Sequence, residues 1–453
     1  MTLRQRFRKL FSPALVRRWL QDDSGRFYDR LFTPLIALWY LMSQRLGQTH
    51  TLSQVLADAR FGGADALCSP GKRLSRQLKS LSTAAWSNAR QRLPLALLQR
   101  ALAHSAKEIG SWANNTCWQG WNVLLLDGST VRLRSLGNIP QNFPPHRNSH
   151  GVSYWCLMRV VVGFCLNTGL AVVTSMSACS VGEQTLSVQL LGQLGPKTLI
   201  VADRNFGIFF LAQAVVDVSA QLLVRLTESR ARKMARDQGL PWRRSSDRPF
   251  KWSASSKDRA NPDSPHPTLA GRLLTVRITR RGFRSQTLFL FTTLTDTELY
   301  SAQALLDLYG RRWQVELNLR FVKAQMELGV LECKSAAMAQ KEWVAGLLAY
   351  NLIRSLMVAT AAQAEISVWK LSFSRTRELL NQWIKTQAAS RRDAANQWEC
   401  LLQLIGKCRQ PTRHRPRPSE PRAKRFFKQD FVTLRGSRAL ARRKLQAQMK
   451  SKS

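Results

Sequence analysis

The chain has 453 residues, of which 44% are apolar, so it can bury a large core, is not a disordered protein, and has room for roughly two or three domains. Its 69 Lys and Arg residues outnumber its 28 Asp and Glu residues, which gives a formal net charge of +41. An enzyme with a small-molecule substrate does not need this excess, because like charges repel one another and destabilise the fold. We therefore expect a polyanionic partner, with nucleic acid first and an anionic membrane surface second.

The sequence gives little support for a membrane protein, a secreted protein or a thiol–metal protein. The apolar run at residues 31–42 is about half the length of a spanning helix and contains Pro34. The N-terminus has no signal-peptide pattern. The eight cysteines are scattered without a Cys-x-x-Cys pair, which favours reduced thiols in a cytoplasmic protein. We do not expect His146 and His150, in a Pro/Asn-rich loop, to bind metal.

Residues 1–119 read as an N-terminal helical domain. It begins with a basic arm in which Arg and Lys alternate with Leu, Phe and Val. Residues 82–93 resemble one helix of a helix-turn-helix, with polar and basic side chains available to a DNA groove. An ordinary amphipathic helix capped by Ser80 or Ser82 is an equally good interpretation. We predict a DNA-binding domain here.

Residues 120–226 change to an alternation of strands and helices. An apolar run from residue 123 ends at Asp127-Gly128, and a second, from residue 198, ends at Asp203. Between them a hairpin (155–164 and 170–177) and a helix (183–194) are predicted, and after them a helix (206–218) and a strand (221–226). This order builds a mixed α/β sheet flanked by helices and matches the ribonuclease H-like fold. Asp127 and Asp203 would then end adjacent central strands.

The remaining segments complete the predicted domain plan. Residues 227–296 read as a β-rich insertion, with a hairpin at 273–279 and 286–294, and they divide the catalytic domain into 120–226 and 297–362. A hydrophobic helix at 340–362 should pack on the sheet. Residues 363–408 form a C-terminal helical region, and 409–453 a basic tail that is partly disordered until it meets a polyanion. A solvated tail without function is the alternative.

Residues 309–323 carry the most informative spacing. In one α-helix, Tyr309, Arg312, Glu316 and Lys323 would point within an arc of roughly 60° and span about 21 Å of the axis. A carboxylate would thus lie among a phenol, a guanidinium and an ammonium. A solvated helix face with an Arg–Glu pair at i, i+4 would give the same pattern.

Three acids at one sheet edge suit divalent cations. If the fold brings Asp127, Asp203 and Glu316 together, their oxygens could hold two Mg²⁺ ions, or Mn²⁺ in their place. Two such ions about 3.5–4 Å apart support in-line displacement at a phosphodiester. Arg312 could bind a phosphate in bidentate fashion, Lys323 could add a charge, and Tyr309 could donate a hydrogen bond or stack.

These residues resemble those of a known family. Tyr309, Arg312, Glu316 and Lys323 match the Tyr-x2-Arg-x3-Glu-x6-Lys signature of the insertion-sequence-four family of DDE transposases. The segments 127–130 and 202–207 are similar to the regions of that family's first and second catalytic Asp, and the β-rich insertion is also a family trait. The resemblance covers roughly residues 75–360.

The resemblance implies a function in some detail. It implies Mg²⁺-dependent cut-and-paste transposition by a dimeric synaptic complex, with double-stranded transposon ends and target DNA as partners and a hairpin intermediate. It implies Asp127, Asp203 and Glu316 as catalytic and metal-binding residues, and Tyr309, Arg312 and Lys323 as DNA-binding residues. A tryptophan of the insertion, Trp242 or Trp252, could stack on a flipped base or belong to the core. No small-molecule substrate or membrane is implied.

Two alternatives remain open at this point. A related metal-dependent nuclease, such as a resolvase, would carry the same acids but cut without joining. A regulator or inactivated transposase that only binds transposon ends would not need the acids. The long flanking domains favour a transposase over the first, and the retained acids favour it over the second.

Overall fold

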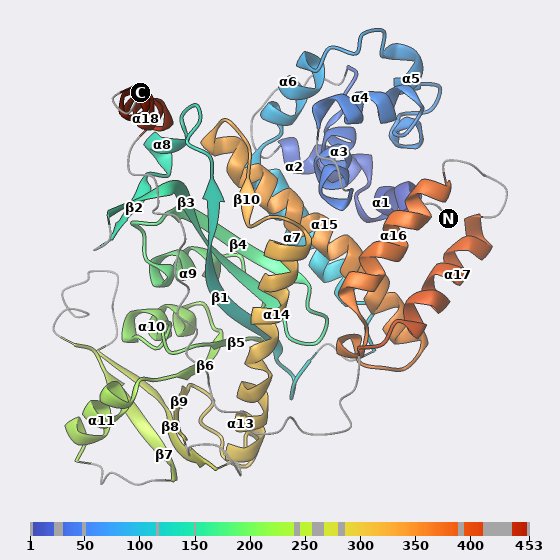
Figure 1. The fold of residues 1–453 in the computed structure, drawn as a ribbon. Helices are drawn as coiled ribbons and strands as arrows, with labels where there is room; N and C mark the ends of the chain where they lie inside the picture. The colour runs from blue at the N-terminus through green and yellow to red at the C-terminus, as the bar shows by residue number, and fades with distance from the viewer. Residues whose placement is uncertain are drawn as a thin grey trace.

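The computed structural model describes residues 3–21, 30–47, 51–114, 117–148, 151–239, 245–255, 267–279, 286–387, 394–410 and 437–450. Within this part of the chain, ten strands form one mixed sheet flanked by helices (Figure 1). The strand order is β2-β3-β1-β5-β6-β9-β8-β7, with β4 paired to β3 and β10 paired to β1. The mixed α/β class predicted from the sequence is confirmed.

The strands are β1 (Asn122–Leu133), β2 (Pro145–Asn148), β3 (Gly151–Cys165), β4 (Ala171–Ala178), β5 (Thr198–Ala202), β6 (Gln221–Arg225), β7 (Ser246–Ser253), β8 (Thr268–Ile278), β9 (Gln286–Thr292) and β10 (Val330–Leu331). The first helices are α1 (Leu3–Leu10), α2 (Pro13–Gln21), α3 (Pro34–Leu46), α4 (Leu52–Arg60), α5 (Leu74–Gln77), α6 (Ala84–Arg92), α7 (Leu95–Gly110) and α8 (Ile139–Asn142). The others are α9 (Glu183–Leu191), α10 (Phe209–Asp217), α11 (Glu228–Asp237), α13 (Ala302–Gly310), α14 (Gln314–Arg320), α15 (Ala336–Gln363), α16 (Phe373–Gln387), α17 (Ala394–Lys407) and α18 (Arg438–Lys450).

β1 is the central strand and is buried on both faces. Because side chains alternate along a strand, Leu125 and Val131 enter one hydrophobic core while Leu124 and Leu126 enter another. The first core includes the N-terminal helices, α7 and α15, and the second includes α9 and α10. The two strand runs, the hairpin and the helix–strand order predicted for residues 120–226 all form, with ends shifted by a few residues.

α15 joins the N-terminal helices to the sheet. It packs against α3, α7 and β4 and lies between the sheet and the N-terminal helices in Figure 1. Its residue Glu342 is 6% exposed and is ion-paired with both Arg45 and Arg90 of the N-terminal helices. α15 is long and apolar enough to cross a membrane, which the sequence reading did not anticipate, but its most apolar window is 94% buried inside the protein. It is therefore a core helix.

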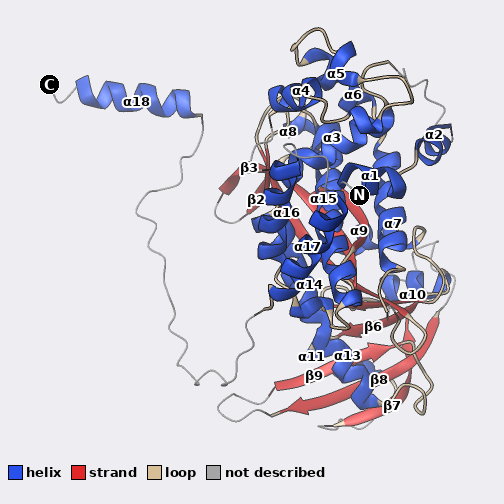
Figure 2. Cartoon of the chain, turned by 90° about the vertical axis from the view of Figure 1, so that its right-hand side faces the viewer, coloured by secondary structure: helices blue, strands red, loops and turns tan. Residues whose placement is uncertain are grey.

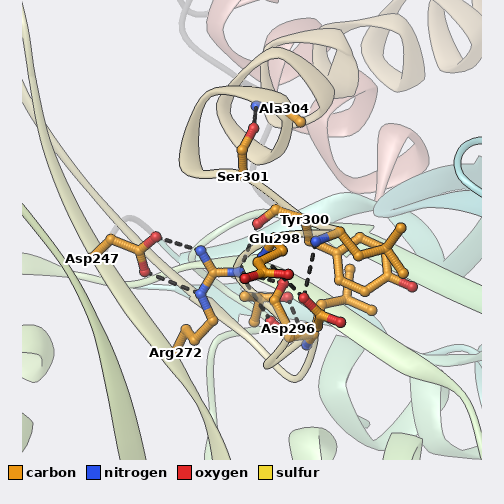
Figure 3. A network of polar contacts seen from close by, with 10 residues as sticks. Asp247, Arg272, Asp296, Glu298, Tyr300, Ser301 and Ala304 are labelled. Atoms are coloured by element: carbon orange, nitrogen blue, oxygen red, sulfur yellow. Dashed lines mark hydrogen bonds and ion pairs between the residues drawn. The ribbon is translucent and has the colours of Figure 1, made fainter.

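The segment predicted as a β-rich insertion extends the central sheet. β9 pairs with β6, and β8 and β7 follow outward, with the additional helix α11 beside them. Arg272, 1% exposed, binds the Asp247 carboxylate through two nitrogens and donates to the Asp296 and Tyr300 carbonyls (Figure 3). Trp252 is 5% exposed and belongs to the core, so it is not placed to stack on a base. Trp242 lies outside the described residues.

The segment predicted as one α-helix around Glu316 is four consecutive pieces. α13 is followed by a 3-10 turn (Arg311–Trp313), then α14, then a π-helical segment (Phe321–Gln325). The prediction of one continuous α-helix was wrong. At the end of the π-helical segment the Val322 and Lys323 carbonyls accept hydrogen bonds from the amides of Leu328 and Gly329, six residues further along the chain.

The C-terminal part is helical where it is described. α16 and α17 pack against each other and against α15. α18 stands apart from the main body (Figure 2). The tail segment predicted to be disordered falls largely on residues 411–436, outside the described residues.

Candidate active site

Asp127 and Asp203 are neighbours at one edge of adjacent strands. β1 and β5 run parallel, with Leu126 opposite Ala202. The residue that follows Leu126 is Asp127, and the residue that follows Ala202 is Asp203. Neighbouring strands lie about 4.8 Å apart. Each carboxylate accepts a hydrogen bond from a nearby backbone amide: Asp127 from Gly128 and Asp203 from Asn205, both at 2.8 Å. The sequence prediction that these acids lie side by side on adjacent strands holds in the structure. The prediction that both end their strands was wrong for Asp127, because β1 continues to Leu133, whereas Asp203 directly follows β5.

The acids face a gap in the strand pairing. On one edge, β1 pairs with β5 up to Leu126 and with β10 from Arg132 onward. Between these points the described residues give β1 no strand partner on that edge, although its other edge stays paired to β3. α14 packs on β1. Polar side chains can therefore occupy this gap without interrupting a hydrogen-bond ladder.

Asp127 lies in an electrostatically unusual environment. The pKa of its carboxyl is raised to about 6, chiefly by burial and also by the nearby carboxylates of Asp203 and Glu183, while the Gly128 amide and the Arg312 guanidinium lower it. The carboxyl therefore takes up its proton at a higher pH than an exposed aspartate does. A cation brought to this edge would favour the ionised form of the Asp127 carboxyl.

Glu316 is linked to the aspartates through Arg312. The guanidinium donates to Glu316 Oε1 at 2.5 Å and also acts on the pKa of Asp127. Burial lowers the pKa of Arg312, but the hydrogen bond and the charges of Glu316, Tyr309 and Asp127 raise it overall. Tyr309 is 9% exposed, and burial raises the pKa of its phenol to about 12. The ring of Tyr309 is therefore largely covered by protein.

Lys323 reaches β1 from the π-helical segment. Its ammonium donates to the Ser129 hydroxyl at 2.9 Å, two residues after Asp127 on the same face of the strand. Burial lowers the pKa of Lys323, and nearby Arg132 adds to this. All six residues singled out from the sequence thus lie around one edge of the sheet.

The donor chemistry of this edge suits a hard divalent cation, because its ligand atoms are carboxylate oxygens. Within the described part of the chain, however, no three His, Cys, Asp or Glu side chains form a closed metal-binding group. Glu316 is turned toward Arg312. An ion here would rest on one or two carboxylates, with waters and substrate oxygens as its other ligands, which is the coordination that Mg²⁺ usually takes.

The sequence reading missed one acid at this edge, Glu183. It is the first residue of α9, and its Oε2 accepts a hydrogen bond from Asn205 Nδ2 at 2.6 Å. No motif marks it. Its only signal in the sequence is its place at the start of the helix that follows the predicted hairpin.

A hollow of about 510 Å³ adjoins the site on the side of the extended sheet. Tyr309, Arg312 and Trp313 line one wall, and Arg225, Val276 and Leu288 line another. Trp313 is 60% exposed.

The fold and the site together place carboxylates, which are ligands suited to divalent metals, beside cationic side chains on a strongly basic α/β protein. A family model described as the transposase DDE domain matches residues 118–352, a little over half of the chain. The chain therefore belongs to the family of DDE-domain transposases and is of the IS4 type.

Among its relatives is the transposase InsG for insertion sequence element IS4 of Escherichia coli. The two are 25% identical over 389 residues, covering 83% of this chain and 82% of that protein. Among solved structures, the piggyBac transposase synaptic complex with hairpin DNA aligns over 88% of this chain and 84% of that one. The two chains are 9% identical in sequence and superpose with a TM-score of 0.39.

Proposed function

We propose that this transposase binds the terminal inverted repeats of a bacterial insertion sequence and moves it by cut-and-paste transposition through a hairpin intermediate. The observation that carries the proposal is the meeting of Asp127, Asp203 and the Arg312-bound Glu316 at one edge of the sheet. A ribonuclease H-like core (120–226 and 297–362) would supply these residues, and the N-terminal helices (1–119) and basic tail (409–453) would bind DNA.

The cationic residues have separate roles in this proposal. Arg312 would bind a phosphate of the transposon end through its guanidinium. Lys323 would add a point charge at the adjacent phosphate, held in place by Ser129. Tyr309, buried beside Arg312, would orient that guanidinium and would not stack on DNA. The large net charge of +41 would attract the polyanion from a distance.

Asp127, Asp203 and Glu316 would hold two Mg²⁺ ions, or Mn²⁺, once DNA supplies further oxygens. The ions would lower the pKa of the attacking water or 3′-hydroxyl and stabilise the leaving oxygen. Cleavage at two transposon ends would require a homodimer in the synaptic complex. We place the protein in the bacterial cytoplasm, at the nucleoid, where its substrate lies.

The test uses Asp203→Asn and Glu316→Gln. Each change removes a charge and keeps the shape of the side chain, and the amide oxygen can still accept from Asn205 or Arg312. Strand cleavage of DNA carrying the element's inverted repeats should fall by at least 10³-fold, while binding in a gel shift survives. Undiminished cleavage would count against the acid triad.

The same assay distinguishes the neighbouring functions. A nuclease or resolvase would cleave without joining the freed 3′ end to target DNA. An end-binding regulator would shift repeat DNA but give no metal-dependent nick.

A further inference from the structure

The helical segment around Glu316 rests on a buried cation, the guanidinium of Arg354 in α15. Arg354 is 1% exposed. Its Nη2 donates to Asn318 Oδ1 in α14 at 2.7 Å, and its Nε donates to the Tyr350 hydroxyl at 2.8 Å. The Tyr350 hydroxyl donates in turn to the Gly169 carbonyl, in the turn between β3 and β4, at 2.7 Å. Arg354 therefore links α14 to α15 and to the sheet.

The charge of Arg354 has no carboxylate partner among the ion pairs of the described residues. Four aromatic rings lie around it instead, with centroids between 4.9 and 5.7 Å from its Cζ: Phe321, Tyr350, Trp369 and Phe373. Cation–π contacts and hydrogen bonds to neutral groups offset the cost of burying the charge. An apolar side chain would fill this space without that cost but could not bond to α14 and Tyr350 together.

Asn318 connects this cation to the catalytic edge. It is two residues after Glu316, and two residues along a helix correspond to a rotation of about 200°. Asn318 is accordingly 0% exposed, while Glu316 turns toward Arg312. Only the oxygen of the Asn318 amide is used, because its Nδ2 is buried without a partner. A bond that holds Asn318 therefore sets the rotation of α14 about its axis, and with it the direction of Glu316.

The same support holds the segment on both sides of α14. Before α14, Arg311 donates to Asn167 Oδ1 in the β3–β4 turn at 2.9 Å. After α14, the ring of Phe321 stacks on Phe373 with centroids 4.8 Å apart. Gly169 leaves room for the cation, since a Cβ there would lie 2.8 Å from Arg354 Cζ. The segment is thus anchored on the side away from the acid edge.

We propose that Arg354 is a positioning residue for strand cleavage, which holds Glu316 at the acid edge through Asn318 and α14. The inference rests on the proposed function, because that function places Glu316 in the catalytic machinery. A displacement of about 1 Å in a catalytic group can slow a reaction by roughly 10²-fold. Arg354 is too deeply buried to touch DNA, so its loss should slow cleavage without weakening end binding.

The test compares two buried arginines in the full chain. Arg354→Met and Arg272→Met each remove a guanidinium that is 1% exposed, so both should lower the stability of the fold. Single-turnover cleavage of inverted-repeat DNA is measured at saturating protein and well below both unfolding transitions. The rate should fall by about 10²-fold in Arg354→Met and stay near that of the wild type in Arg272→Met. End affinity, measured by fluorescence anisotropy, should be unaltered in both. Equal cleavage rates in the two variants would overturn the inference.

A pair of changes at Asn318 decides the question even if Arg354→Met does not fold. Asn318→Asp keeps the accepting oxygen, loses only the unpartnered Nδ2 and places a carboxylate beside Arg354, so it should cleave as the wild type does. Asn318→Leu fills a similar volume but cannot accept, and it should slow cleavage as Arg354→Met does. Equal rates in these two variants would also overturn the inference. Undiminished cleavage in Asp203→Asn would instead remove the proposed function itself.

Discussion

The Lys323 ammonium and the Ser129 hydroxyl, 194 residues apart in the chain, form a hydrogen bond of 2.9 Å beside the catalytic edge. The bond fixes a long, mobile side chain at a definite place on β1. Lys323 lies in the π-helical segment Phe321–Gln325, which this bond ties to the central strand of the sheet.

Replacing Lys323 by Gln should therefore weaken binding to transposon ends and lower its salt dependence. Loss of one phosphate contact reduces the slope of log K against log salt concentration by about 0.9. The measurement is a salt titration of end binding by fluorescence anisotropy. The control is Lys197→Gln, which removes the same charge. Lys197 lies just before β5, at the end of that strand opposite to Asp203. An equal slope for the wild type and Lys323→Gln would refute the phosphate contact.

Much of this site could be predicted from local sequence. The apolar runs before Asp127 and Asp203 specify two buried strands, and the parallel pairing of these strands places the acids side by side, although β1 continues past Asp127 to Leu133. Glu316 and its neighbours were recognisable because their spacing forms a signature. The pairing of the two aspartates needed only chain order and the geometry of parallel strands, whereas the assignment of Glu316 rested on resemblance to a known family.

Other features could not be predicted because they depend on contacts distant in sequence. The 3-10 turn and the π-helical segment on either side of α14 have no sequence signal, so the segment was predicted as one continuous α-helix. Pairing of β9 with β6 made the insertion part of the main sheet. Glu183 belongs to the site only through Gly128 and Asn205, neither of which is near it in sequence.

Tyr309→Phe tests whether the buried phenol acts through Arg312. The change keeps the ring but removes the hydrogen bond between the phenol and the guanidinium. A hydrogen bond to a charged group contributes about 1.5–3 kcal/mol, so we expect cleavage to slow by roughly 10- to 100-fold. Affinity for the ends, measured by anisotropy, should change by less than about twofold, because Arg312 retains its charge. A loss confined to affinity would instead place the phenol on the DNA.

Arg272→Met should destabilise the protein without touching the acid edge. Arg272 is 1% exposed, and its removal leaves the Asp247 carboxylate and buried carbonyls without their donor (Figure 3). Breaking a buried ion pair costs about 3–5 kcal/mol in the free energy of unfolding, which urea titration measures. Arg134→Met breaks an exposed pair with Glu332, whose side chains are 52% and 67% exposed, and should cost less than about 1 kcal/mol. Similar losses in both variants would contradict a structural role for the Arg272 network.

Asp127→Asn should inactivate the protein and make it more stable. The gain in stability should depend on pH. The carboxyl pKa rises from 3.8 in the unfolded chain to about 6 in the fold, so the native state binds the proton more tightly. The wild-type free energy of unfolding should therefore fall as pH rises from about 4 to about 6 and then level off. Asparagine carries no charge, keeps an oxygen for the Gly128 amide, and avoids this loss. The variant should match the wild type near pH 4 and exceed it by about 3 kcal/mol at pH 7.5 in EDTA.

Adding Mg²⁺ should narrow the gap at pH 7.5, because a cation bound to the ionised carboxylates stabilises only the wild type. Urea unfolding at several pH values, with and without Mg²⁺, measures both effects. Asp217→Asn, at the C-terminal end of α10, is the matched control. A stability gap between Asp127→Asn and the wild type that does not vary with pH would show that the destabilisation does not arise from the ionised carboxyl of Asp127.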